Sequence, residues 1–156
     1  MNGMDKIDHA IIYALQNDGR LTNQELAERV NLSPSPCLRR VRNLEQSGVI
    51  TGYSAQVDPK KYGLTITMFV RITLEKHNRA VITRFEEAVQ SMDEIMECHL
   101  LTGSADYLLR ISVIDLDDYN RFMREQLHEI SGIAAIDTAF AFGEVKKQNW
   151  YKSPVS

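Results

Sequence analysis

Residues Thr22 to Gly48 read TNQELAERVNLSPSPCLRRVRNLEQSG, and the rest of the chain is organised around this stretch. Thr22 and Glu25 have the spacing of a capping box, which predicts that a first helix begins there. Ser33 and Pro34 are favoured at the N-cap and in the first turn of a second helix, and Gly48 is a signal for its end. Two helices joined by so short a connection predict a helix-turn-helix, whose second helix can enter the major groove of DNA.

The second helix is expected to have an apolar side and a polar side. Leu38, Val41 and Glu45 fall on one side, with Leu44 at its margin. The other side is small, polar or cationic, and positions 33–44 contain three arginines and no acidic residue. Arginine and asparagine form bidentate contacts with guanine and adenine, and arginine also binds phosphates. We therefore predict that DNA is bound by Ser33, Ser35, Pro36, Arg39, Arg40, Arg42 and Asn43.

A solvated basic face is the alternative explanation of this pattern, because many soluble helices carry one. The segment that follows favours DNA binding. Residues 49–57 contain two β-prone runs around Gly52, which predict a small hairpin, or wing. Together with an amphipathic helix expected from Asp5 to Leu15, they predict a winged helix-turn-helix domain over residues 1–57.

Several motifs of the chain resemble those of one family of bacterial and archaeal transcription factors, the leucine-responsive and asparagine-responsive (Lrp/AsnC, or feast/famine) regulators. In the first half these motifs are Asp18-Gly19-Arg20, Leu32-Ser33-Pro34-Ser35-Pro36-Cys37-Leu38, Gly48-Val49-Ile50 and Gly52-Tyr53. In the second half they are Glu97-Cys98-His99-Leu100, Thr102-Gly103 and Asp106-Tyr107-Leu108-Leu109. The resemblance covers nearly the whole chain. It implies dimers that associate further, often into octamers, and amino-acid binding in the second domain at contacts between dimers.

The second half of the chain reads as a βαββαβ unit. After a linker at residues 58–64, we expect strands at 65–75, 95–102, 107–114 and 134–147, a helix capped by Asn78 and another over 116–130. This order predicts an α+β fold in which residues 65–150 form a ferredoxin-like sandwich, followed by a tail at 151–156. One sheet face stays uncovered, and we predict a homodimer through it. Its residues would be Phe69, Arg71, Thr73, Leu108, Arg110, Ser112 and Ile114.

The segment between the second and third strands, residues 101–107, contains the parts that a free amino acid needs. Gly103 permits close approach of a ligand to the backbone, and Asp106 can receive an ammonium group. The same residues also form ordinary hairpin turns, so the segment by itself leaves both interpretations open. The family resemblance nominates Leu100, Thr102, Gly103, Asp106 and Tyr107, and more loosely His128 and Phe140. It implies leucine or another small apolar amino acid as effector, while Ser104-Ala105 departs from the acid and aromatic residue frequent in relatives.

The composition indicates a globular protein. The chain has 156 residues, 44% of them hydrophobic, which suffices for a packed core. No apolar run approaches the roughly 20 residues that span a bilayer, and the N-terminus does not resemble a secretory signal, so we expect a cytoplasmic protein without membrane contact. Cys37 and Cys98 cannot form a disulfide framework, and no Cys/His spacing indicates a metal site. We expect Cys37 to be a small buried apolar group rather than a thiol sensor.

The net charge of −3 is unevenly distributed. Residues 1–57 carry six Lys/Arg and six Asp/Glu, whereas residues 58–156 carry twelve and fifteen. A neutral domain with a modest basic patch binds DNA weakly as a single copy. We therefore expect two or more copies to act together on one DNA.

These patterns predict a sequence-specific, DNA-binding transcriptional regulator whose oligomeric C-terminal domain senses a small amino acid. No catalytic arrangement or cofactor motif is recognisable, because the four histidines fall in different elements and lack nucleophilic partners. The alternative function is an architectural, nucleoid-type DNA-binding protein with little dependence on ligand. The two functions differ in whether the loop that contains Asp106 binds a ligand.

Overall fold

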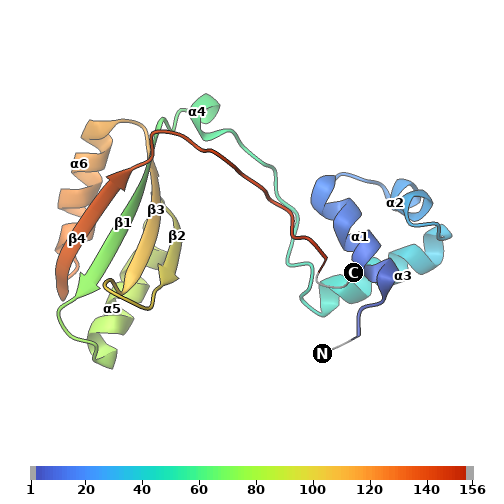
Figure 1. Cartoon of the computed structure of the whole chain (residues 1–156), viewed down its shortest axis with the longest axis horizontal. Helices are drawn as coiled ribbons and strands as arrows, with labels where there is room; N and C mark the ends of the chain where they lie inside the picture. The colour runs from blue at the N-terminus through green and yellow to red at the C-terminus, as the bar shows by residue number, and fades with distance from the viewer. Residues whose placement is uncertain (1–2, 154–156) are drawn as a thin grey trace. The chain divides into compact units, whose positions relative to one another are not determined.

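The computed structural model describes residues 3–153 (Figure 1). These residues form two compact units. The first contains the residues up to Gln56 together with those from Val145 onward, and the second extends from Val57 to Glu144. The chain thus returns to the first unit after the second is complete. Residues 145–150, expected in the second domain, lie in the first unit.

The first unit has three helices, α1 (Lys6–Asn17), α2 (Asn23–Arg29) and α3 (Pro34–Gln46). The capping box of Thr22 and Glu25 is confirmed, and a second one joins Asp5 to Asp8 at the start of α1. Each box pairs backbone N–H groups that the first turn of a helix leaves without partners. The three helices enclose a small core, which consists of Ile11, Ala14, Leu26, Ala27, Cys37 and Leu44.

The apolar side of α3 differs from the prediction. Cys37 and Leu44 are buried, whereas Leu38 is 38% exposed. The buried side is therefore centred on Cys37, with the half-buried Val41 beside it. The expectation that Cys37 is a buried apolar group is confirmed, and burial raises the pKa of its thiol.

The predicted two-stranded wing is absent from the described chain, because residues 51–58 contain no strand pairing. Runs of so few residues do not form a stable hairpin without a partner. The segment is nevertheless attached to α3. The hydroxyl of Tyr53 donates to Glu45 Oε1 at 2.9 Å, and burial together with this carboxylate raises the tyrosine pKa to about 12.

The second unit begins with a one-turn helix, α4 (Pro59–Tyr62), inside the segment expected to be a linker. The βαββαβ unit follows as β1 (Ile66–Leu74), α5 (Arg79–Gln90), β2 (Ile95–Leu100), β3 (Tyr107–Val113), α6 (Leu116–Glu125), the 3₁₀ turn η1 (Leu127–Glu129) and β4 (Ile133–Phe140). The predicted cap at Asn78 is present. Three extents differ from the prediction. The last helix ends at Glu125 and is followed by η1, β4 ends at Phe140 rather than near 147, and β2 ends at Leu100 rather than 102.

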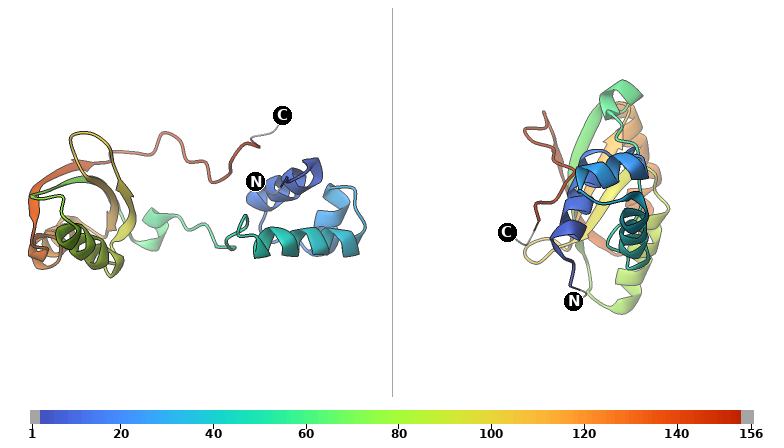
Figure 2. Two further views of the ribbon diagram at one scale, coloured as in Figure 1. Left: turned by 90° about the horizontal axis from the view of Figure 1, so that it is seen from below. Right: turned by 90° about the vertical axis from the view of Figure 1, so that its right-hand side faces the viewer.

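The four strands form one antiparallel sheet in the order β2-β3-β1-β4. Both α5 and α6 cover the same face of this sheet, as the left view of Figure 2 shows. The alternation in β1 is confirmed, since Met68, Val70, Ile72 and Leu74 are buried under the helices while Phe69 and Arg71 are exposed. The predicted α+β sandwich is therefore correct, and one face of the sheet has no helix over it.

Among residues 3–153, every helix is too short or too polar to cross a bilayer. Within the same range, no three His, Cys, Asp or Glu side chains gather in a group that could hold a metal ion.

Candidate nucleic-acid interface and effector loop

The outward side of α3 is polar and positively charged. Ser35, Arg39, Arg42 and Asn43 are all exposed along this helix. Within the described residues, neither Arg39 nor Arg42 forms an ion pair or a side-chain hydrogen bond, so both guanidinium groups are available to an external anion. Pro36 is half-buried at the edge of this side, and Ser33 caps the helix by its backbone conformation without a side-chain hydrogen bond.

Arg40 differs from the other two arginines of α3. Its guanidinium group forms ion pairs with Asp5 at 2.9 Å and with Asp8 at 2.7 Å, both at the start of α1. Hydrogen bonds to Asp8 and then to Asp5 raise its pKa, and the pKa of Asp5 is lowered by the backbone N–H of Asp8 and by Arg40. Arg40 is among the residues predicted to bind DNA, but in the structure its guanidinium group holds α3 against α1.

Asn23 is a positioning residue that the sequence analysis does not identify. Its side-chain amide donates to the carbonyl oxygen of Pro34 at 2.8 Å and so joins the first residues of α2 and α3. This contact fixes the turn between the two helices and therefore the direction in which α3 presents its side chains. Asparagine is common after a cap residue, so the sequence contains no signal that distinguishes this role.

The loop between β2 and β3 is closed by hydrogen bonds around Asp106. The N–H of Leu101 donates to the carbonyl of Asp106 at 2.8 Å, and the N–H of Asp106 donates to Ile72. The Asp106 carboxylate receives the N–H of Leu74 at 2.7 Å and lies 2.7 Å from Nε2 of His77. The Leu74 bond, followed by the His77 contact, lowers the pKa of Asp106. The carboxylate therefore remains charged near neutral pH and joins the loop to the end of β1.

The structure brings some of the predicted effector residues together and separates others. Leu100 is exposed at the end of β2, and Thr102 and Gly103 are exposed on the loop that contains Asp106. Gly103 has a positive φ of 130°. Tyr107 is buried under α5, where its hydroxyl donates to Glu86 Oε1 at 2.8 Å, and burial raises its pKa. Its hydroxyl thus points into the helix layer rather than toward the loop.

His128 and Phe140 lie on other elements. His128 is exposed on η1. Phe140 packs edge-to-face on Tyr119 and pairs in register with Met68. Tyr107, in contrast, pairs with Ile72, four residues farther along β1, which places Phe140 roughly 13 Å along the sheet from the loop end. One copy of the chain therefore does not gather all seven predicted effector residues.

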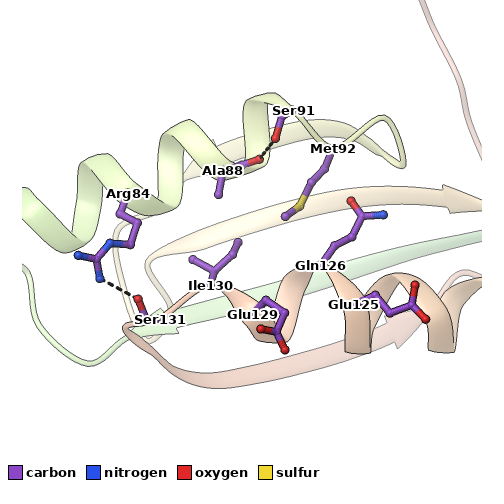
Figure 3. A pocket seen from close by; sticks show the side chains of 9 residues that line it. All are labelled: Arg84, Ala88, Ser91, Met92, Glu125, Gln126, Glu129, Ile130 and Ser131. Carbon is purple, nitrogen blue, oxygen red and sulfur yellow. Dashed lines mark hydrogen bonds between the residues drawn. The ribbon is translucent and has the colours of Figure 1, made fainter.

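A groove of about 390 Å³ opens between α5 and the α6–η1 segment (Figure 3). Ala88, Met92 and Ile130 form its apolar part, and Arg84 donates to Ser131 Oγ at 2.7 Å at one end. None of the residues predicted for the effector site line this groove.

The uncovered face of the sheet combines apolar side chains with ion pairs. Phe69 is 40% exposed at its centre. On either side, Arg71 pairs with Asp137 at 3.0 Å and Arg110 pairs with Glu97 at 2.6 Å. Each arginine of this face thus has a carboxylate partner on a neighbouring strand.

The two halves of the chain match two described families. Residues 4–51 match the winged helix-turn-helix DNA-binding domains, and residues 67–151 match the Lrp/AsnC ligand binding domain. The leucine-responsive regulatory protein of Escherichia coli K12 is 43% identical over 146 residues, which cover 94% of this chain and 89% of the relative. The same protein of Klebsiella pneumoniae has the same identity and coverage.

Two solved structures are similar over nearly the whole chain. A transcriptional regulator of Neisseria meningitidis, solved as a complex with L-Met, is 36% identical and has a TM-score of 0.89. The match covers 94% of this chain and 94% of the relative. An AsnC family transcriptional regulator of Agrobacterium tumefaciens is 35% identical with a TM-score of 0.90, over 96% of this chain and 97% of the relative. The chain therefore belongs to the Lrp/AsnC family of transcriptional regulators, with a winged helix-turn-helix DNA-binding domain followed by an Lrp/AsnC ligand binding domain.

Proposed function

We propose that this regulator recognises a specific DNA sequence by placing the outward side of α3 in the major groove. The observation that carries this proposal is the pair of exposed, unpaired guanidinium groups of Arg39 and Arg42 on a helix side without acidic residues. Ser35 and Asn43 lie on the same side and can add hydrogen bonds to base edges. Arg40 supports this contact indirectly. Its guanidinium group is paired with Asp5 and Asp8 and so holds α3 in position against α1. Such a regulator works in the cytoplasm, where chromosomal DNA is accessible.

We further propose that the loop from Leu100 to Asp106 binds a small apolar amino acid. Support comes from its exposed Thr102 and Gly103, from the charged carboxylate of Asp106, and from the L-Met complex of the Neisseria meningitidis regulator. Each oxygen of Asp106 uses one lone pair in its contacts with Leu74 and His77, so a ligand ammonium group can still be received. Phe140 would join the site from another copy of the chain, because within one copy it pairs with Met68, away from the end of β1 that contacts the loop. His128 on η1 is the second residue proposed to complete the site.

The active assembly in this proposal is a homodimer formed through the uncovered sheet face, with dimers associating further into octamers. Phe69 is exposed on that face, and its arginines are already neutralised by Glu97 and Asp137. Burial of paired charges costs less than burial of single charges, so such a face suits contact with a second copy. A dimer also supplies two DNA-binding units, which a neutral domain with few cations requires for useful affinity.

Calorimetry with single amino acids, together with DNA footprinting, tests the proposal. We expect heat of binding with L-methionine or L-leucine, and short, sequence-dependent footprints that change when the same amino acid is present. Absence of heat across a panel of amino acids, combined with long footprints that disappear in salt, would favour an architectural DNA-wrapping protein instead.

A further inference from the structure

The end of the chain is attached to the DNA-binding unit by a specific set of contacts. We call residues 145–153 the C-terminal strap; they belong to the first unit. The side chain of Gln16 on α1 accepts the N–H of Tyr151 at 2.7 Å and donates to the carbonyl of the same residue at 3.2 Å. Beside this pair, the rings of Tyr13 and Trp150 meet edge to face, with centroids 5.8 Å apart and an angle of 82°.

These contacts use a side of α1 that its own core leaves free. Ile11 and Ala14 face the buried interior, whereas Tyr13 is 52% exposed even with the strap in place. Gln16 lies one turn from Tyr13 on the same side of the helix. The primary amide of Gln16 pairs with both backbone groups of Tyr151. The contact therefore requires an extended backbone with Tyr151 opposite Gln16, which apolar packing alone would not require.

The strap carries a strong positive charge. Its sequence VKKQNWYKS contains Lys146, Lys147 and Lys152 and no acidic residue. The three lysines are exposed, and none forms an ion pair within the described residues. Residues 1–57 carry six Lys/Arg and six Asp/Glu, so attachment of the strap changes a neutral DNA-binding unit into one with a charge of about +3.

We propose that the C-terminal strap, docked on α1 through Gln16 and Tyr13, is a second DNA-binding element that supplies lysine contacts to backbone phosphates beside the helix-turn-helix. This inference rests on the proposed DNA binding by α3 and adds a sequence-independent part to it. Lysine ammonium groups bind phosphates without reading bases, so the strap contributes affinity and salt dependence and leaves sequence preference to α3.

The number of phosphate contacts is measured by the slope of log K against log salt concentration, which changes by about 0.9 for each contact with duplex DNA. We compare the full chain with the triple variant Lys146→Gln, Lys147→Gln, Lys152→Gln on a random-sequence DNA duplex. We expect the magnitude of the slope to fall by about 1 to 3 per subunit. A matched control changes three exposed cations of the second unit, Lys76→Gln, Arg79→Gln and Arg124→Gln, and leaves the slope unchanged.

Docking itself has an independent measurement, because Trp150 is the only tryptophan in the chain. In Gln16→Ala, which removes both hydrogen bonds to Tyr151, we expect the tryptophan emission to shift to longer wavelength and its anisotropy to fall. Circular dichroism checks that the helices remain folded. The control Gln90→Ala, an exposed glutamine at the end of α5, leaves the emission unchanged.

The outcomes separate this inference from the proposed function. If the parent chain binds no DNA, the proposed function fails as a whole. If the parent binds DNA and the triple lysine variant has the same salt slope, the strap is no DNA-binding element. If the emission of the folded parent equals that of the chain in urea, or if Gln16→Ala does not change it, the strap is not docked as proposed, and the inference is also overturned.

Discussion

The outward side of α3 and the uncovered face of the sheet both carry arginine residues, but only those on the sheet are paired with carboxylates. Arg39 and Arg42 on α3 are without carboxylate partners in the described structure. On the sheet, Arg71 and Arg110 are each paired with a carboxylate of a neighbouring strand. A surface with unpaired cations is suited to a partner that brings its own negative charge. A surface with internal ion pairs and a central phenylalanine is suited to a partner of similar composition, such as a second copy.

The largest effect is expected where the sheet face loses its charge balance. Phe69→Lys places an additional cation between Arg71 and Arg110, so two copies of the face repel each other. We expect the proposed dimer to dissociate, and affinity for DNA with two half-sites to fall by about 100-fold because two DNA-binding units would no longer act together. Sedimentation equilibrium and gel-shift titration measure the two effects. Leu116→Lys, an exposed position on α6, is the control; a dimeric Phe69→Lys variant would place the interface elsewhere.

The next effect is the loss of one unpaired cation from α3. Arg39→Ala should weaken binding to the preferred DNA sequence by about 1–3 kcal/mol, with a smaller loss on random DNA, because a bidentate contact with guanine disappears. Competition titrations on both DNAs give the difference. Arg121→Ala, whose parent residue pairs with Asp118 on α6, should leave both affinities unchanged. Equal losses on both DNAs would show that Arg39 contacts phosphate rather than a base.

Arg40 tests whether a paired arginine on the same helix behaves differently. Arg40→Ala leaves Asp5 and Asp8 without their cation, so we expect a lower thermal midpoint of the DNA-binding unit, with sequence preference retained in the folded fraction. Thermal unfolding followed by helical circular dichroism provides the measurement, and Arg42→Ala is the matched variant without such partners. An unchanged thermal midpoint for Arg40→Ala, together with reduced sequence preference, would show that Arg40 contacts DNA directly.

The smallest effect concerns the pH dependence of the sheet-face ion pairs. The pKa of Glu97 lies below its usual value of 4.5, chiefly because Arg110 donates to it and also because of His99. A lowered carboxyl pKa stabilises the fold above the usual value, and this stabilisation is lost as the pH falls through the lowered value. The parent should therefore unfold at a higher temperature than Glu97→Gln near neutral pH, and the difference should close on acidification. A constant difference across this range would exclude a charge effect.

Much of this molecule follows from patterns of adjacent residues. The capping box of Thr22 and Glu25, the alternation in β1 and the order of strands and helices each depend on local spacing, and the structure confirms them. The features that sequence reasoning did not find depend on contacts between distant residues. Arg40 has the same side chain as Arg39, and only the fold places the carboxylates of Asp5 and Asp8 beside it.

The same limit applies to the effector loop and the wing. Residues 101–107 form the predicted loop, yet the orientation of Tyr107 toward Glu86 depends on how α5 lies over the sheet. The wing residues have strand propensity, but among residues 3–153 no strand pairs with them. The attachment of Tyr151 to Gln16 joins positions 135 residues apart, which no local pattern encodes.

The hydrogen bonds of Asp106 have a thermodynamic consequence for ligand capture. Leu101, Leu74 and His77 hold Asp106 in place at the end of the loop without a ligand. Where the position of a binding residue is already fixed, less conformational entropy is lost when the ligand binds, and more of the interaction free energy remains as affinity. In the proposed assembly this loop would form one prearranged part of the amino-acid site, and a second copy of the chain would complete it.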